Sequence, residues 1–123
     1  MKLNDILNKT CVIGLTYFDG DNRVLKQSML AGTVTSADEE NGITVRLVKK
    51  NPKDEDSHFI LPTSLAPWFT APKGTYRDQN SSVLIADPAF LVTWDIFRTQ
   101  EKKPDGDHEW WNWVARTTPP SVG

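Results

Sequence analysis

Cysteine and histidine are scarce in this chain, which limits the chemistry that its side chains can carry. The sequence holds one cysteine, Cys11, and two histidines, His58 and His108. A lone cysteine excludes an intrachain disulfide, so the composition does not indicate an oxidising compartment. The histidines lack the spacing and cysteine partners of a metal site, and we expect neither a metal nor a cofactor. Cys11 precedes the apolar Val12 and Ile13, which favours a core thiol over a catalytic one.

The chain also lacks an excess of positive charge and any long hydrophobic run. Lysine and arginine total 14 against 16 aspartate and glutamate residues, so the formal net charge is −2. Nucleic-acid binding depends on clustered basic residues, and we therefore expect no nucleic-acid partner. The first apolar run, residues 11–15, is too short for a signal peptide, and none approaches a membrane span. These absences predict a cytoplasmic protein with no membrane partner.

Motifs for the common catalytic chemistries are missing as well. The sequence has no glycine-rich phosphate loop and no Gly-x-Ser-x-Gly nucleophile elbow. The acidic runs 19–22 and 105–107 lack the ligand spacing of a calcium-binding loop and read as hairpin turns. We therefore expect a protein that is not an enzyme. The alternative is a small enzyme whose site is assembled from dispersed polar residues.

The chain does contain a succession of short strand patterns. Its length suits one domain, residues 1–123. Ile43, Val45 and Leu47 alternate with Thr44 and Arg46, which predicts a strand with one buried face. The run 29–35 reads as its antiparallel partner, with residues 36–42 as a solvated turn. This hairpin is the element around which we expect the fold to form.

The remaining elements are predicted from apolar spacing and turn residues. Leu3, Ile6 and Leu7 predict a short helix within residues 1–9. Further strands are predicted at residues 11–18, 24–35, 58–61, 74–77, 90–100 and 108–116. Glycines inside the strands, Gly14 and Gly32, indicate bends or bulges. The fold class is thus all-β: a small barrel over residues 10–98, residues 99–116 as the second arm of a C-terminal β-hairpin, and a loose tail at 117–123.

Several short phrases resemble a known group. They are residues 15–19 (LTYFD), 30–34 (LAGTV), 42–43 (GI), 61–62 (LP), 71–77 (APKGTYR) and 87–88 (DP), followed by 93–94 (TW). Together they resemble small uncharacterised bacterial proteins expected to form an SH3-like or Sm-like β-barrel. Gly32, Asp38 and Leu47 sit where the first Sm motif has such residues, but the Arg-Gly pair of the second motif has no counterpart. The resemblance therefore implies a fold but brings no known activity, and RNA binding does not carry over from the Sm fold.

Tryptophan is the most informative residue type, with five in the chain. Trp111 and Trp113 share one face of a predicted strand and Trp110 the other, so both faces carry large apolar surface. Either an indole surface is available to a partner, or the C-terminal hairpin folds over the barrel and buries all three. The candidate binding residues are Trp110, Trp111, Trp113, Trp68 and Phe69, together with the acidic loop residues Asp54, Glu55 and Asp56.

These features favour a non-catalytic module that binds another protein of unknown identity. One version is an immunity or inhibitor protein whose acidic loops cover the basic site of a toxin, and a homo-oligomer is compatible with the sequence. A flat aromatic patch with a charged rim would favour the binding module. Clustered carboxylates with shifted pKa values in one deep pocket would favour the enzyme. Oligonucleotide binding ranks last, because only Arg98 and Arg116 lie near the aromatic residues.

Overall fold

The computed structural model describes the backbone of residues 1–48, 53, 55–77, 84–103 and 106–117. Side chains are described over the same ranges except for residues 99–110. Asp54, the side chains of Trp110 and His108, and residues 118–123 of the expected tail therefore lie outside the described part.

The chain is all-β, as the strand patterns predict, with one short 3₁₀ turn in place of the expected helix. The elements are η1 (Leu3–Ile6), β1 (Thr10–Phe18), β2 (Val24–Asp38), β3 (Gly42–Leu47), β4 (His58–Leu61), β5 (Trp68–Thr70), β6 (Thr75–Arg77), β7 (Leu84–Ala86), β8 (Phe90–Lys103) and β9 (Gly106–Ala115). The sequence pattern does not predict β5 or β7, because a strand of three residues is too short to show a period.

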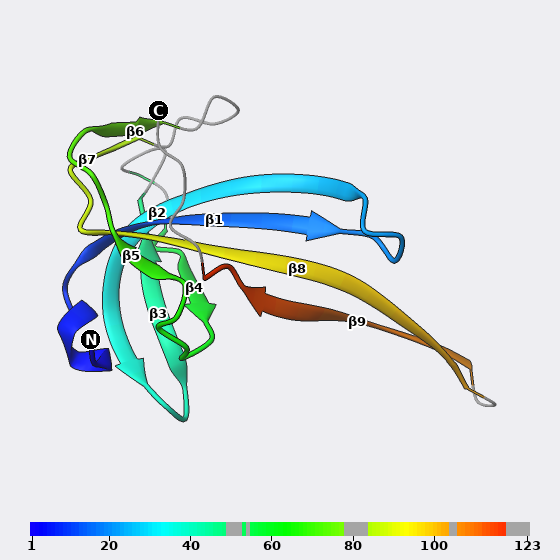
Figure 1. The fold of residues 1–123 in the computed structure, drawn as a ribbon. Helices are drawn as coiled ribbons and strands as arrows, with labels where there is room; N and C mark the ends of the chain where they lie inside the picture. Colours follow the sequence, from blue (N-terminus) through cyan, green and yellow to red (C-terminus); the bar gives the residue numbers. More distant parts are fainter. Residues whose placement is uncertain (49–52, 54, 78–83, 104–105, 118–123) are drawn as a thin grey trace.

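Seven strands form one curved sheet in the order β4-β3-β2-β1-β8-β5, with β9 paired to β8 (Figure 1). β6 and β7 form a separate two-stranded sheet. β1 and β8 run parallel, from the pair Cys11 with Phe90 to the pair Phe18 with Phe97. The strand order ends at β4 on one side and at β5 on the other, so the sheet is not closed within the described chain. The expected closed SH3-like barrel is therefore not confirmed, although the sheet curls strongly.

The hairpin predicted from residues 29–47 is confirmed. Gly32 pairs with Leu47 and Val34 with Val45, in antiparallel register. Ile43 and Val45 are fully buried, Leu47 is half-buried and Arg46 is exposed. The turn is shorter than predicted, because β2 continues to Asp38 and leaves only residues 39–41 between the strands. The register shifts between Val34 and Ser36, a bulge that bends this long strand.

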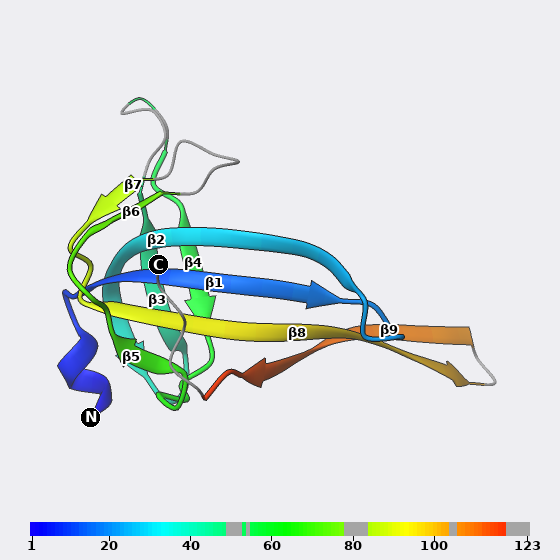
Figure 2. The ribbon, with the colours of Figure 1, turned by 45° about the horizontal axis from the view of Figure 1, so that its top comes forward.

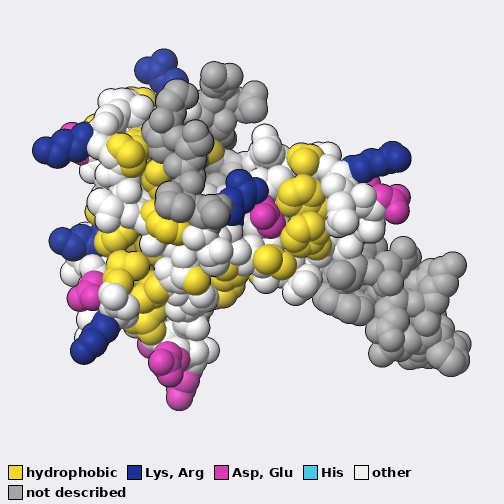
Figure 3. Space-filling view, viewed as in Figure 1, with side chains coloured by type: hydrophobic (Ala, Val, Ile, Leu, Met, Phe, Trp, Pro, Cys, Tyr) yellow, Lys and Arg dark blue, Asp and Glu magenta, His cyan; other side chains and the backbone are white. Residues whose placement is uncertain are grey.

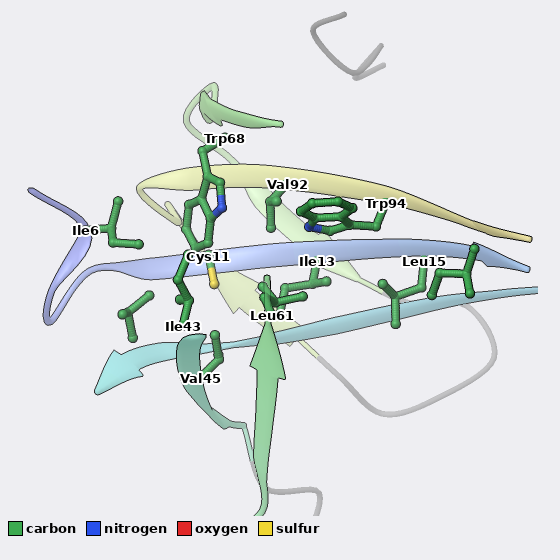
Figure 4. Packing of buried hydrophobic residues seen from close by; sticks show 12 residues of the cluster. Ile6, Cys11, Ile13, Leu15, Ile43, Val45, Leu61, Trp68, Val92 and Trp94 are labelled. Carbon is green, nitrogen blue, oxygen red and sulfur yellow. The ribbon is translucent and has the colours of Figure 1, made fainter. Parts of the chain in front are cut away.

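The main core lies on the concave face of the sheet (Figure 4). Its fully or nearly fully buried members are Ile6, Cys11, Ile13, Leu15, Val34, Ile43, Val45, Leu61, Trp68, Val92, Trp94 and Ile96. Alternate residues of β1 and β8 line this core, because successive side chains of a strand point to opposite faces of the sheet.

A smaller apolar cluster lies on the opposite face of the same strands. Val12, Ala31 and Leu91 form it, and Tyr76 of β6 and Ile85 of β7 pack against it. The β6–β7 hairpin thus covers the second face near the start of β1 (Figure 2).

The β8–β9 hairpin extends beyond the rest of the sheet as an arm (Figures 1 and 2). β1 pairs with β8 only as far as Phe97, whereas β9 pairs with β8 from Trp94 to Lys103. The hairpin predicted from the C-terminal sequence is therefore present, with both strands reaching closer to the turn than expected. Its geometry places the tryptophans of β9 along the arm.

Candidate functional site

Trp113 lies at the base of the arm and joins the core. It pairs across the ladder with Ile96, and its ring meets that of Trp94 at 5.9 Å and that of Phe59 at 6.2 Å between centroids. Its side chain is half-buried and packs against the main core. The ring contact between Trp113 and Phe59 therefore connects β9 to β4, although these two strands are not paired with each other.

Trp111 lies two residues further out on the same face and is more accessible. Its exposed fraction is 43%, although its ring meets Tyr17 edge to face at 5.7 Å. Arg98 is its cross-strand partner on β8, and Lys26 Nζ lies 5.8 Å from the centroid of the Tyr17 ring. We call Tyr17, Lys26, Arg98 and Trp111 the arm face. It combines an exposed indole, held by a second ring, with two cationic side chains.

The opposite side of the arm has a different character. Phe18 and Phe97 stack at 4.7 Å between ring centroids, and Arg116 forms an ion pair with Asp95. Val114 has an exposed fraction of 42% there, nearly that of Trp111 on the other face. Trp110 pairs with Thr99 through the backbone.

Trp68 and Phe69 separate in the structure. Trp68 is 4% exposed and meets the Phe90 ring at 5.8 Å, so it belongs to the core. Phe69 is half-buried. The indole N–H groups of Trp68 and Trp94 are buried without an acceptor among the described residues. Neither Trp68 nor Phe69 contributes to the arm face.

The acidic loop that contains Glu55 and Asp56 is exposed and precedes β4. A second acidic segment, the β2–β3 turn, forms one end of the molecule (Figure 3). There Asp38 Oδ1 accepts hydrogen bonds from the N–H groups of Asn41, at 2.6 Å, and Glu40, at 3.0 Å. The bond from the Asn41 N–H is the main reason that the pKa of Asp38 is lowered. Asp38 thus holds the turn, while Glu39 and Glu40 are exposed.

Asp19, Asp21 and Arg98 line a hollow of about 300 Å³ at the β1–β2 turn. Asp19 Oδ1 accepts hydrogen bonds from the N–H groups of Arg23 and Asp21. The bond from Arg23 is the largest cause of the lowered pKa of Asp19. A carboxyl group that is strongly ionised and engaged by its own turn suits a structural role better than proton transfer at neutral pH.

Cys11 is fully buried, as its apolar neighbours predict, and burial raises its pKa to about 12. A neutral, inaccessible thiol is a poor nucleophile. His58 is exposed at the start of β4. Among the residues whose side chains are described, no three histidine, cysteine, aspartate or glutamate residues are grouped closely enough to hold a metal ion.

The sequence identifies Trp111 and places Arg98 near the aromatic residues, but it does not indicate Tyr17 or Lys26 as their neighbours. Tyr17 meets Trp111, and Lys26 lies beside Tyr17, because β1 lies parallel to β8 and between β2 and β8. Arg98 faces Trp111 across the β8–β9 hairpin. The alternation of Cys11, Ile13, Leu15 and Tyr17 was the available signal, but the register between β1 and β8 is not encoded locally.

No helix in the described part of the chain is long and apolar enough to cross a membrane. Comparisons of the chain with protein-family models, with curated proteins and with solved structures find no match.

Proposed function

We propose that this chain is a non-catalytic module that binds another protein through the arm face. The observation that carries the proposal is the 43% exposure of Trp111 on a projecting hairpin. Half-exposed indoles with charged neighbours are frequent anchors of protein interfaces, since they bury much apolar area with few rotatable bonds. The ring of Tyr17 fixes the orientation of the indole, which lowers the entropy lost on binding.

The charge around the arm face indicates the kind of partner. Lys26 and Arg98 flank the Tyr17–Trp111 pair. An acidic rim on the partner, around an apolar pocket for the indole, would complement this surface. We propose that the module acts in the cytoplasm and that its curled sheet is a relative of the SH3-like or Sm-like barrels. The immunity or inhibitor role is a narrower version, in which the acidic loop at Glu55 and Asp56 would face a basic partner site.

The alternative function is that of a small enzyme. The two carboxyl groups with clearly shifted pKa values in the described chain, those of Asp19 and Asp38, belong to separate turns and are both lowered. Each shift is caused mainly by a backbone hydrogen bond within its own turn. This pattern supports the binding module, because a general acid needs a raised pKa and nearby catalytic partners.

Affinity purification from the native cell tests the proposed function. The full chain carries a tag, and the proteins that co-purify are quantified for wild type, Trp111→Ala and Val114→Ala. Val114 is the matched control, because it is equally exposed on the same strand but faces the other side. We expect Trp111→Ala to lower recovery of the specific partner at least tenfold and Val114→Ala to retain it. Equal recovery with both variants would contradict the proposal.

A further inference from the structure

The outer edge of β4 has backbone groups that are not paired with another strand of the described chain. Within the described chain, β4 pairs only with β3. The N–H of Leu47 donates to the carbonyl oxygen of Ser57 at 2.8 Å, which fixes the phase of the β3–β4 ladder. Hydrogen-bonded and non-hydrogen-bonded pairs alternate in an antiparallel ladder. His58 and Ile60, which lie opposite Arg46 and Thr44, therefore direct their N–H and C=O groups away from β3.

A hollow of about 500 Å³ lies beside this edge, near the end of β4. Ile60, Pro62 and Trp113 supply its main apolar lining. Ile60 has an exposed fraction of 62%, the largest among the exposed large hydrophobic residues of the described chain. An unpaired strand edge next to an apolar hollow is the arrangement that receives an added strand in β-augmentation.

The charge of the hollow specifies the occupant. Glu39 and Glu40 of the β2–β3 turn line it, and no lysine or arginine is among its described lining residues. Asp38, whose pKa is lowered, adds a third negative charge to the same turn. A lysine or arginine side chain can place its aliphatic part on the apolar lining and its cationic head near these carboxylates.

We propose that the β4 edge binds an extended, basic segment of a partner protein by strand addition. The segment pairs with the outward backbone groups of His58 and Ile60, and a lysine or arginine of the segment lies against Glu39 and Glu40. An aliphatic side chain next to it packs on Ile60. This surface is separate from the arm face and does not require the proposed function of Trp111.

Peptide binding to the full-length chain tests this inference. The probe is a fluorescein-labelled ten-residue peptide of alternating lysine and valine, measured by fluorescence anisotropy at about 50 mM salt, where surface charges are weakly screened. Two matched peptides serve as controls: one with glutamate in place of lysine, and one with N-methylated backbone amides on the edge that would pair. We expect the basic peptide to bind at least tenfold more tightly than either control peptide.

Variants separate strand addition from general charge attraction. Glu39→Gln with Glu40→Gln should weaken binding of the basic peptide at least tenfold. Asp21→Asn with Asp87→Asn removes the same charge from exposed carboxylates outside the hollow and should leave binding within twofold. Ile60→Pro removes the outward N–H without removing a bond to β3, and it should also weaken binding tenfold. Trp111→Ala should bind as wild type, which keeps this test independent of the arm face.

Four results would overturn the inference: no binding of the basic peptide, equal binding of the glutamate peptide, equal binding of the N-methylated peptide, or equal weakening by the two double variants. Self-association of the chain through this edge is a further competing outcome. It would appear in sedimentation velocity as a concentration-dependent dimer, and Ile60→Pro would abolish that dimer. The occupant of the β4 edge would then be a second copy of this chain and not a basic segment of another protein.

Discussion

Trp111 and Trp113 show how position along one strand face decides the role of a residue. Both point to the same side of β9, and the sequence pattern treats them as equivalent. Trp113 lies where the sheet curls and meets Trp94 and Phe59, whereas Trp111 lies further along the arm and meets Tyr17. Large side chains at the two positions therefore remove very different amounts of surface from water.

Trp113→Ala and Trp111→Ala should lower the stability of the protein by different amounts. Trp113→Ala removes ring contacts inside the core and should lower the free energy of unfolding by about 2–4 kcal/mol. Trp111→Ala removes one edge contact from a half-exposed ring and should cost about 1 kcal/mol. Urea unfolding followed by circular dichroism measures both. Equal losses would show that Trp111 is a core residue and would remove the support for a binding role.

Cys11 makes a contribution to the free energy of unfolding that depends on pH, and the raised pKa of its thiol fixes the sign of that dependence. Burial raises its pKa in the folded state to about 12, from an ordinary value of 9.0. Because the unfolded thiol ionises first, the stability that Cys11 confers is fully present below pH 9. It falls as the pH rises from 9 towards 12, by about 1.4 kcal/mol per pH unit.

Comparison with Cys11→Ala isolates this contribution from other groups that titrate at high pH. We expect the difference in unfolding free energy between wild type and Cys11→Ala to be constant from pH 7 to 8.5. It should then change steadily in favour of the variant up to pH 10.5. In the native protein at pH 8, a thiol reagent should label Cys11 only after unfolding. Parallel pH curves, or rapid native labelling, would show that the thiol is accessible.

At the scale of elements, Gly32 permits the close approach of β3 to β2. A Cβ atom at this position would overlap the carbonyl oxygen of Arg46 and lie 2.8 Å from Cγ1 of Val45. Gly14, in contrast, has its nearest neighbour at ordinary contact distance, 3.5 Å to Oγ1 of Thr93. The two glycines that the sequence marks as bends therefore have different reasons to be there.

Alanine substitutions distinguish these reasons. Gly32→Ala forces the β2–β3 pair apart and should lower the free energy of unfolding by about 2–3 kcal/mol. Gly14→Ala should change it by less than about 1 kcal/mol, since the added methyl group meets Thr93 without overlap. Thermal unfolding of both variants provides the comparison. Similar losses at the two positions would contradict the close approach described for β3.

Local pattern predicted the elements with a single buried face and could not predict how distant elements pair. Ile43 and Val45 alternate with Thr44 and Arg46, so the strand and its buried face were readable. The parallel pairing of β1 with β8 joins residues about 80 positions apart, and no turn links them. The membership of Tyr17 in the arm face depends on that long-range pairing, whereas Arg98 joins it through the β8–β9 hairpin.

On the scale of the whole molecule, the open strand order creates two distinct surfaces. β1 and β8 are neighbours inside the sheet, so strands from the first and the last third of the sequence pair there (Figure 1). The arm leaves the sheet on the β8–β9 side with cationic residues beside an indole. The β4 edge lies at the other end of the strand order, beside an acidic turn. Lys26 and Arg98 lie beside the indole on the arm, whereas Glu39 and Glu40 lie beside the β4 edge, which favours different partners or different parts of one partner.

Site-specific photo-crosslinking in the native cell shows whether the arm face contacts another protein. A benzophenone amino acid replaces Trp111 in one variant and Val114 in another, because these side chains are equally exposed on opposite faces of β9. We expect a discrete protein adduct from position 111 that is absent from position 114. No adduct from position 111, or the same adducts from both positions, would contradict it.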